Sequence, residues 1–468
     1  MQNSNWLFIS ILFITTLFFV ACKKDKDIIA ATPPTAAGNG GGGTVSSLQI
    51  KDSVLLLSKN IYLWNTQIPS SFNVQSYLDP SSIMTAIRPY SMEQGFSTAV
   101  DKWSFAMKKT EWDQMSGGTS TLSAITGNGD FGFSVFFKAE GDLRVRLVEP
   151  NSPAGLAGVH RSWRVISING NSNMTAANSS FIINATSNST SGAFTFQKSD
   201  GVTIALNLNA ANYTKKPVYM DTVYQVNGKR IGYLVFNSFL GNINNINSEF
   251  QRVFNRFANA QVTDVVVDLR YNGGGYVSLA EQLSNYLVRS SANGSLMMTQ
   301  LYNNQNSQNN EVTNFRKAGS VSVDDVYFIV GRGTASASEL LINNLKPYMD
   351  VKLIGPTPTH GKPVGFFPIP VGDWYIFPVS FRTTNKNGEG NYFNGMPVNA
   401  QIADGLDKDW GDTNETSLAS AIRNITTGNY LVNFAGEPAY QESLPVSLGN
   451  GKLNESSLKV TIGNLKNF

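Results

Sequence analysis

The stretch that most constrains the fold is Gly331–Lys362, because it joins two expected strands through a helix. A short run of β-branched and aromatic residues, Val326–Val330, precedes it and is typical of a buried strand. A Gly/Ser-rich turn follows, and Ala337–Lys346 then has helical composition. A second short strand is expected at Val351–Ile354. Strands that alternate with helices in this way predict an α/β fold.

A second strand–loop–helix unit lies upstream. Val265–Leu269 is mostly apolar, as in strands that helices bury on both faces, and Ser278–Val288 is expected to be a helix. The loop between them contains Gly273 and Gly274. Phosphate-binding loops share this layout, but their lysine-serine/threonine ending is missing here. Glycines permit close backbone approach, so paired N–H groups of this loop are expected to form an oxyanion hole.

The strand–turn–helix corner at Ser336 and Ser338 suits nucleophilic chemistry. A serine hydroxyl at this corner lies near the N-terminus of the helix, where free N–H groups and the dipole stabilise negative charge. The pair Gly361-Lys362 follows the second strand. This layout can bring a lysine amine to a serine hydroxyl, which is the Ser–Lys form of an activated nucleophile.

Composition excludes several alternatives. The chain has 468 residues, 41% hydrophobic and 15% charged, which predicts a globular protein of two to three domains. A net charge of +3 without a Lys/Arg cluster gives no nucleic-acid footprint. Two histidines and one cysteine exclude a disulfide and leave little for a metal site, so no metal and no cofactor are expected.

Residues 1–22 are expected to be a targeting segment. Trp6–Ala21 is apolar but short for a membrane span, and it ends at Cys22. The segment resembles a bacterial lipoprotein signal, which implies lipidation of Cys22 and export to the outer membrane, on its periplasmic side or at the cell surface. It departs from that pattern at Phe19 and in the absence of Lys or Arg before Trp6. An uncleaved membrane anchor is the alternative. Residues 23–46, rich in Pro and Gly, are expected to be a flexible linker.

Residues 47–117 are predicted to be helical, and residues 118–212 change to short β-type runs. Ser152-Pro153-Ala154 and Ile168-Asn169-Gly170 are among the pieces of this β-rich segment that resemble a PDZ domain of the bacterial protease type. That resemblance implies a carboxylate-binding loop at Phe131-Gly132-Phe133, where a peptide adds as a strand. The segment departs from the pattern at Arg161–Arg164, where Gly-Asp is usual. A β-sandwich that binds nothing is the alternative.

The order of three motifs then points to a family. VVVDLRYNGGG, GTASASELL and GPTPTHGK resemble the C-terminal processing peptidases, also called tail-specific proteases. The resemblance covers residues 50–425, with 213–425 as the catalytic domain and 426–468 as a tail without a clear pattern. It implies a serine endopeptidase with a Ser–Lys dyad that cleaves proteins or peptides near their C-termini.

Motif by motif, the resemblance assigns the catalytic roles. Ser336 is the nucleophile and Lys362 the general base, and 362 − 336 = 26 positions separate them. The separation is one longer than expected, with the extra residue placed in Pro356–Pro358. The backbone N–H of Ala337, with that of Gly273 or Gly274, stabilises the oxyanion. Three further residues are expected to shape the glycine loop: Asp268, Arg270 and Asn272.

This mechanism makes a demand on Lys362. An ordinary lysine has a pKa of about 10.4 and is charged at neutral pH, so burial must lower its pKa. The family commonly places Gln four residues after the lysine to orient it, and this chain has Phe366. Glu339, Asn343 and Asn344 are the candidates for the orienting group.

Alternatives to this assignment remain open. His360 is an alternative base, and Ser338 is an alternative nucleophile whose other interpretation is a helix cap. The chain as a whole is read as an exported, lipid-anchored serine protease whose PDZ-like module captures a substrate tail. A catalytically silent peptide-binding homologue is the alternative, favoured by Phe366. The sequence leaves the oligomeric state open.

Overall fold

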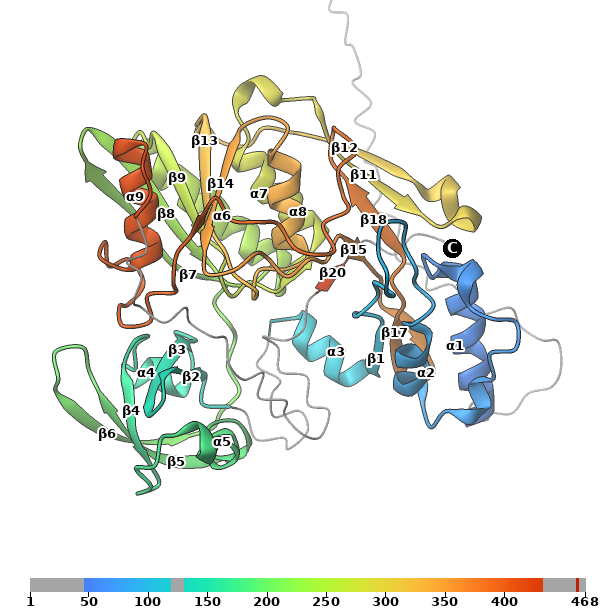
Figure 1. Ribbon diagram of the computed structural model, residues 1–468, viewed down its shortest axis with the longest axis horizontal. Coiled ribbons are helices and arrows are strands. Elements are labelled where there is room, and N and C mark those ends of the chain that lie inside the picture. The colour runs from blue at the N-terminus through green and yellow to red at the C-terminus, as the bar shows by residue number, and fades with distance from the viewer. Residues whose placement is uncertain (1–45, 119–129, 432–459, 463–468) are drawn as a thin grey trace, which may run out of the picture. The chain divides into compact units, whose positions relative to one another are not determined.

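The computed structural model describes residues 46–118, 130–431 and 460–462, all of which belong to one compact unit (Figure 1). Cys22, the expected targeting segment and the linker as far as Val45 lie outside the described residues. Among the helices of the described part, none combines the length and the apolar character needed to cross a bilayer.

The region predicted to be helical, residues 47–117, also contains a strand. Its elements are α1 (Ser47–Ile61), α2 (Pro80–Ile87), β1 (Phe105–Lys108) and α3 (Lys109–Ser116). β1 pairs antiparallel with β17 (Trp374–Phe377), which in turn pairs with β16 (Ile369–Val371). The helical prediction is therefore wrong at β1, because its pairing partner lies far away in the sequence and leaves no local signal.

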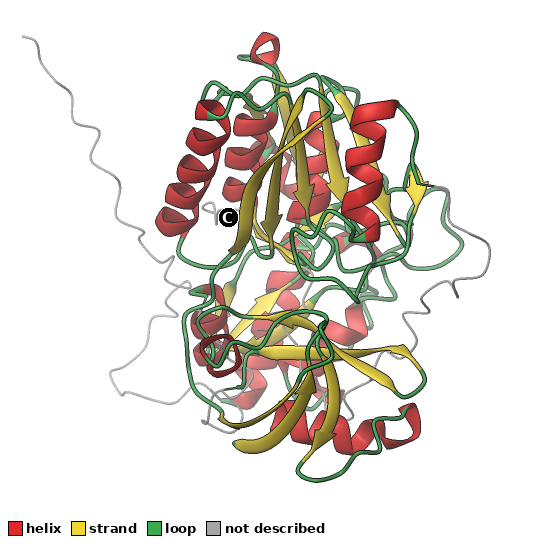
Figure 2. Cartoon of the chain, turned by 90° about the vertical axis from the view of Figure 1, so that its left-hand side faces the viewer, coloured by secondary structure: helices red, strands yellow, loops and turns green. Residues whose placement is uncertain are grey.

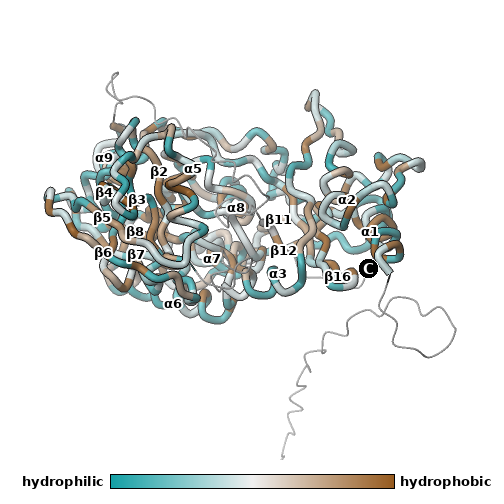
Figure 3. Tube along the Cα trace, turned by 90° about the horizontal axis from the view of Figure 1, so that it is seen from below, coloured by the Kyte–Doolittle hydropathy of each residue, from teal (hydrophilic) through white to brown (hydrophobic). Residues whose placement is uncertain are grey.

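A five-stranded antiparallel sheet follows, in the order β2-β3-β4-β5-β6. Its strands are β2 (Phe133–Ala139), β3 (Asp142–Val148), β4 (Arg164–Ile168), β5 (Ser191–Gln197) and β6 (Thr203–Asn209). Two short helices accompany it, α4 (Pro153–Leu156) and α5 (Ser179–Ile183). Hydrophobic and hydrophilic residues alternate along β5 and β6, as in strands with one buried face (Figure 3). This sheet has its own core, which includes Phe131, Phe194 and Phe196.

A six-stranded sheet forms the centre of the remaining domain, in the order β19-β14-β13-β9-β8-β7. Its strands are β7 (Val218–Val226), β8 (Lys229–Phe236), β9 (Asp264–Asp268), β13 (Asp325–Ile329), β14 (Asp350–Gly355) and β19 (Ala400–Gln401). All neighbours run parallel except β7, which is antiparallel to β8.

Helices cover both faces of this sheet (Figure 2). They are α6 (Ile243–Asn259), α7 (Val277–Leu287), α8 (Ala337–Leu345) and α9 (Thr416–Thr427). Along β9 the side chains alternate between two cores, Val265 and Val267 facing α6, α7 and α8, and Val266 facing α9. The predicted α/β fold is confirmed, and α9 continues past the predicted domain boundary at residue 425.

Two smaller sheets complete the described part. The first joins β12 (Glu311–Asn314), β11 (Leu296–Tyr302), β18 (Phe381–Thr384) and β15 (Val364–Gly365). The second pairs β10 (Gly274–Tyr276) with β20 (Val460–Ile462), so the tail predicted at residues 426–468 supplies one strand.

Candidate active site

The predicted site residues follow the carboxyl ends of neighbouring parallel strands. β9 leads to the glycine loop, β13 leads to the turn before α8, and β14 leads to the segment that carries Lys362. In open α/β sheets these ends meet at one edge, where ligands usually bind. The hydroxyl of Thr334 donates to the carbonyl of Leu269 at 2.7 Å, and the N–H of His360 donates to the carbonyl of Thr334 at 2.9 Å. These bonds join the three segments.

Ser336 has an unusual backbone conformation. It is the N-cap of α8, with φ of 63° and ψ of −113°. A non-glycine residue rarely adopts a positive φ, and such strain persists only where the surroundings enforce it, often at functional sites. The side chain is nearly inaccessible, with the residue 1% exposed. The turn thus holds the Ser336 hydroxyl at the beginning of the helix.

Lys362 reaches Ser336. Its Nζ donates to the Ser336 Oγ at 3.5 Å, and the residue is 1% exposed. Burial lowers the pKa of Lys362 to about 7, although the negative charges of Asp101 and Glu339 act in the opposite direction. The ammonium lies 4.1 Å from the centre of the Phe366 ring, so this ring occupies the neighbourhood of the expected Gln.

Glu339 fixes the backbone around both residues. Its carboxylate accepts from the N–H groups of Ser336 at 2.7 Å, Gly361 at 2.6 Å and Lys362 at 2.9 Å, and from the Thr359 hydroxyl at 2.6 Å. The predicted orienting residue therefore acts on the main chain beside the dyad. Of the other two candidates, Asn343 donates to the carbonyl of Glu389 and Asn344 is fully buried.

The glycine loop is held against the turn before α8. The carbonyl of Asn272 accepts from the N–H of Ala335 and the hydroxyl of Ser338, both at 3.1 Å. The Asn272 side chain accepts from the N–H of Gly274 at 2.9 Å, so that N–H is engaged. Among the described residues, the N–H groups of Gly273 and Ala337 have no acceptor, which leaves these two for an oxyanion.

The two rival residues are engaged elsewhere. Ser338 donates to the Asn272 carbonyl and is fully buried, and α8 begins after Ser336, so the capping interpretation of Ser338 is wrong. His360 Nε2 accepts from the indole N–H of Trp103 at 3.2 Å. That contact, which comes from the region predicted to be helical, was not visible in the sequence, nor was the influence of Asp101 on Lys362.

Comparison with known proteins identifies the domain that carries these residues. Residues 230–399 match the model of peptidase family S41. The chain therefore contains an S41 peptidase domain. It is a serine-type peptidase whose substrates are proteins or peptides, as the C-terminal processing peptidase resemblance implied. Comparison with curated protein sequences found no match.

One solved structure shares the fold with a TM-score above 0.5, and others match less closely. A protein of Bacteroides fragilis assigned to the S41 proteases is 22% identical with a TM-score of 0.65, and the match covers 80% of this chain and 97% of that one. The photosystem II D1 C-terminal processing protease is 18% identical with a TM-score of 0.46, covering 76% and 93%. Mature CPAF complexed with lactacystin is 11% identical with a TM-score of 0.40, also covering 76% and 93%.

Behind the glycine loop, the S41 domain holds a buried ion cluster. Arg270 donates to Asp268, Asp404 and Glu415 at distances of 2.6–3.2 Å. Burial alone would lower the pKa of Arg270, but these three carboxylates raise it well above its usual value. Asp268 and Arg270 thus form ion pairs directly before the glycine loop.

Arg161, where the five-stranded domain departs from the PDZ pattern, pairs with residues of the S41 domain. Arg161 donates to Asp404 at 2.6 Å and to the hydroxyl of Tyr271 at 2.8 Å, and Tyr271 donates to Asp404 in turn. His160, next to it, is exposed and pairs with Asp409. The ion cluster therefore extends from the five-stranded domain to the residue beside the glycine loop.

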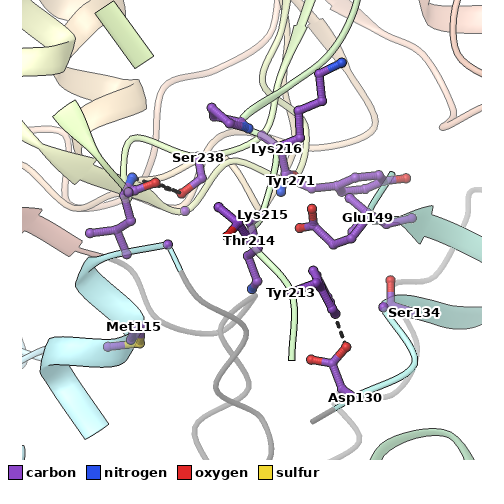
Figure 4. A pocket seen from close by; sticks show the side chains of 18 of the residues that line it. Met115, Asp130, Ser134, Glu149, Tyr213, Thr214, Lys215, Lys216, Ser238 and Tyr271 are labelled. Atoms are coloured by element: carbon purple, nitrogen blue, oxygen red, sulfur yellow. Dashed lines mark hydrogen bonds between the residues drawn. The ribbon is translucent and has the colours of Figure 1, made fainter. Parts of the chain in front are cut away.

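The predicted carboxylate-binding loop borders a cavity of about 180 Å³ that also reaches Gly273 and Gly274. Figure 4 shows this cavity, with Asp130 and Ser134 labelled on either side of the loop. Gly132 has a φ of +79°, and a Cβ there would lie 1.9 Å from that of Ser152, so the position requires glycine. Asp130 accepts a hydrogen bond from the Tyr213 hydroxyl and another from the backbone of Gly132. Burial raises the pKa of Asp130, while Tyr213 and Lys215 act against the rise.

Proposed function

We propose that this S41 peptidase cleaves polypeptides near their C-termini through a dyad of Ser336 and Lys362. The observation that carries the proposal is the buried Lys362 amine, which lies 3.5 Å from a serine hydroxyl held in a strained turn. With a pKa of about 7, a large share of Lys362 is neutral at physiological pH and is able to accept a proton.

The reaction then follows from the positions of the groups. Neutral Lys362 takes the proton of the Ser336 hydroxyl while Oγ attacks the scissile carbonyl carbon. The resulting oxyanion accepts from the N–H groups of Gly273 and Ala337. The Lys362 ammonium gives its proton to the departing amine as the C–N bond breaks. Water, deprotonated by the same amine, releases the acyl group and restores Ser336.

Capture of the substrate tail is the second part of the proposal. β2 is an edge strand of the five-stranded sheet, so an extended peptide can add beside it. The loop before β2 borders the cavity that continues to the glycine loop. The Asp130 carboxylate opposes a bound carboxylate, so Asp130→Asn is expected to tighten binding of a tail peptide severalfold.

The test of catalysis is cleavage of casein by the full chain in mild detergent. Ser336→Ala and Lys362→Ala should each abolish cleavage, and a fluorophosphonate should label the parent but not Ser336→Ala. His360→Ala serves as the matched comparison for the base. Cleavage that survives Lys362→Ala and disappears in His360→Ala would transfer the role of base to His360.

A silent peptide-binding homologue remains the alternative outcome of this test. It is favoured by the aromatic ring of Phe366, which lies 4.1 Å from the amine where a polar group is usual. A parent chain that binds tail peptides, cleaves neither casein nor peptides with an apolar C-terminus, and resists the fluorophosphonate would establish this alternative.

We also propose export and lipid anchoring through Cys22 at the bacterial outer membrane. The support is the sequence alone, an apolar segment that ends at the one cysteine of the chain. The parent should incorporate a labelled fatty acid and sediment with membranes, whereas Cys22→Ala should not incorporate it. Equal labelling of both proteins would refute the proposal.

A further inference from the structure

β20, a strand from the C-terminal region, lies between the glycine loop and Phe366. We infer that β20 occupies a slot that binds an extended segment of substrate, so that the chain's own C-terminal region competes with substrate. The competition rests on the proposed peptidase function, whereas the existence of the slot does not.

One edge of β20 lies along the glycine loop. Val460 pairs with Gly274, Thr461 with Gly275 and Ile462 with Tyr276, in parallel register. β10, the strand formed by these loop residues, begins directly after Gly273, one of the two residues expected to hold the oxyanion. A polypeptide bound here therefore runs beside the atoms that would stabilise the reacting carbonyl.

The other edge of β20 lies beside the general base. Ile462 forms a parallel bridge with Phe366, whose ring contacts the Lys362 ammonium at 4.1 Å. β20 also contacts α8, which begins at the nucleophile, and β15, which begins two residues after Lys362 (Figure 1). The three elements expected to carry the oxyanion hole, the nucleophile and the base thus surround one strand.

The chemistry of the slot indicates what it accepts. Main-chain pairing recognises an extended polypeptide of almost any sequence, and side-chain pockets add selectivity. Ile462 is 4% exposed and packs in the main hydrophobic core, so the slot has one apolar pocket. The matching substrate is an unfolded segment with an aliphatic residue at the position of Ile462.

A tethered segment competes strongly even when its intrinsic affinity is weak. Linkage within one chain gives an effective concentration in the millimolar range. Occupancy by β20 therefore raises the KM for substrates and leaves the chemical step unchanged once the tail is displaced. Stable folded proteins have no segment to insert, so this competition favours unfolded substrates present at high local concentration.

The test compares the full chain in mild detergent with a chain that ends at Lys459 and with the full-length variant Ile462→Asp. Both changes should lower the KM for casein about tenfold, with kcat within twofold of the parent. Leu56→Asp, the same type of change at a residue 71% exposed on α1, should leave KM unchanged. A synthetic peptide of residues 456–468 should inhibit the shortened chain competitively.

Binding of that peptide can be measured without cleavage. In fluorescence anisotropy, the shortened chain carrying Ser336→Ala should bind the 456–468 peptide with high affinity. It should bind the same peptide carrying Ile462→Asp at least tenfold more weakly. Binding without any casein cleavage by the parent would refute the proposed function and retain the slot. An unchanged or higher KM in a folded shortened chain would overturn the inference. So would loss of folding in both variants, because β20 would then be a structural strand.

Discussion

Lys362 and Arg270 are both buried cations of the S41 domain, but their surroundings differ. Arg270 contacts three carboxylates, and its pKa lies well above the usual value. The Lys362 ammonium faces a serine hydroxyl and an aromatic ring, and its pKa falls to about 7. The fold pairs the cation that supports the loop and leaves unpaired the one expected to exchange a proton.

The largest expected effect comes from replacing Lys362 with a residue that stays protonated. Lys362→Arg should lower kcat/KM by at least about a thousandfold, because a guanidinium stays protonated and cannot accept the Ser336 proton. The measurement is peptide cleavage at pH 8, with Ser336→Ala as the floor. Activity within tenfold of the parent would show that loss of a proton by residue 362 is not needed.

Removing the paired cation should destabilise the fold. Arg270→Met leaves Asp268 and Glu415 buried without a cation, while Asp404 keeps its pair with Arg161. Loss of one partner of a buried ion pair typically costs about 3–5 kcal/mol of unfolding free energy. Urea unfolding in the Ser336→Ala background measures it. Lys108→Met removes a half-exposed pair with Asp373 and should change stability by less than about 1 kcal/mol. Equal losses of stability in the two variants would show that the buried Arg270 cluster stabilises the fold no more than the half-exposed pair.

Removing Lys362, the unpaired cation, should instead raise the free energy of unfolding. The pKa of Lys362 is about 7 in the folded chain and about 10.4 when unfolded, so the unfolded chain binds the extra proton between these values. The parent therefore gains stability as pH rises from 7 to 10. Lys362→Met should be more stable than the parent by about 2–4 kcal/mol below pH 7, and the gain should vanish near pH 10.5. Urea unfolding at pH 6, 8 and 10 measures both trends, and a variant less stable than the parent at pH 6 would contradict them.

The smallest expected effect tests how the Phe366 ring influences the pKa of Lys362. In the parent, kcat/KM should rise with pH and reach its midpoint near 7, as Lys362 loses its proton. Phe366→Gln supplies an amide oxygen to the ammonium, which favours the charged form and should move the midpoint up by about one unit. Phe367→Leu, an apolar change at the neighbouring buried position, should leave the midpoint in place. A lower midpoint in Phe366→Gln would assign the pKa to another group.

The sequence predicted the parts of this molecule whose signals are local. Val265–Leu269 and Val326–Val330 matched β9 and β13 to within one residue, since apolar runs bounded by glycine-rich turns describe buried strands directly. The dyad was predicted from short motifs because a turn between a strand and a helix can adopt few backbone conformations. Its residues lie close together, and their catalytic roles stay predictions.

The remaining features depend on pairing between distant segments. Arg161 meets Asp404 across 243 positions, and β1 pairs with a strand more than 250 positions away, so neither contact has a local signature. β20 is three residues long in a polar, Gly/Asn/Ser-rich region, which is too short for alternation to be visible. Asp101 affects Lys362 only through the folded arrangement.

The Glu339 carboxylate has a consequence for how such a chain can vary. It binds the main chain on both sides of a 26-position interval, at Ser336 and at Gly361-Lys362. The distance between nucleophile and base is therefore held by this side chain, together with the bond from His360 to Thr334, and not by the length of the connection. We therefore expect insertions and deletions around Pro356–Pro358 to leave catalysis intact, and a change in the spacing of Glu339 and Ser336 to disrupt it.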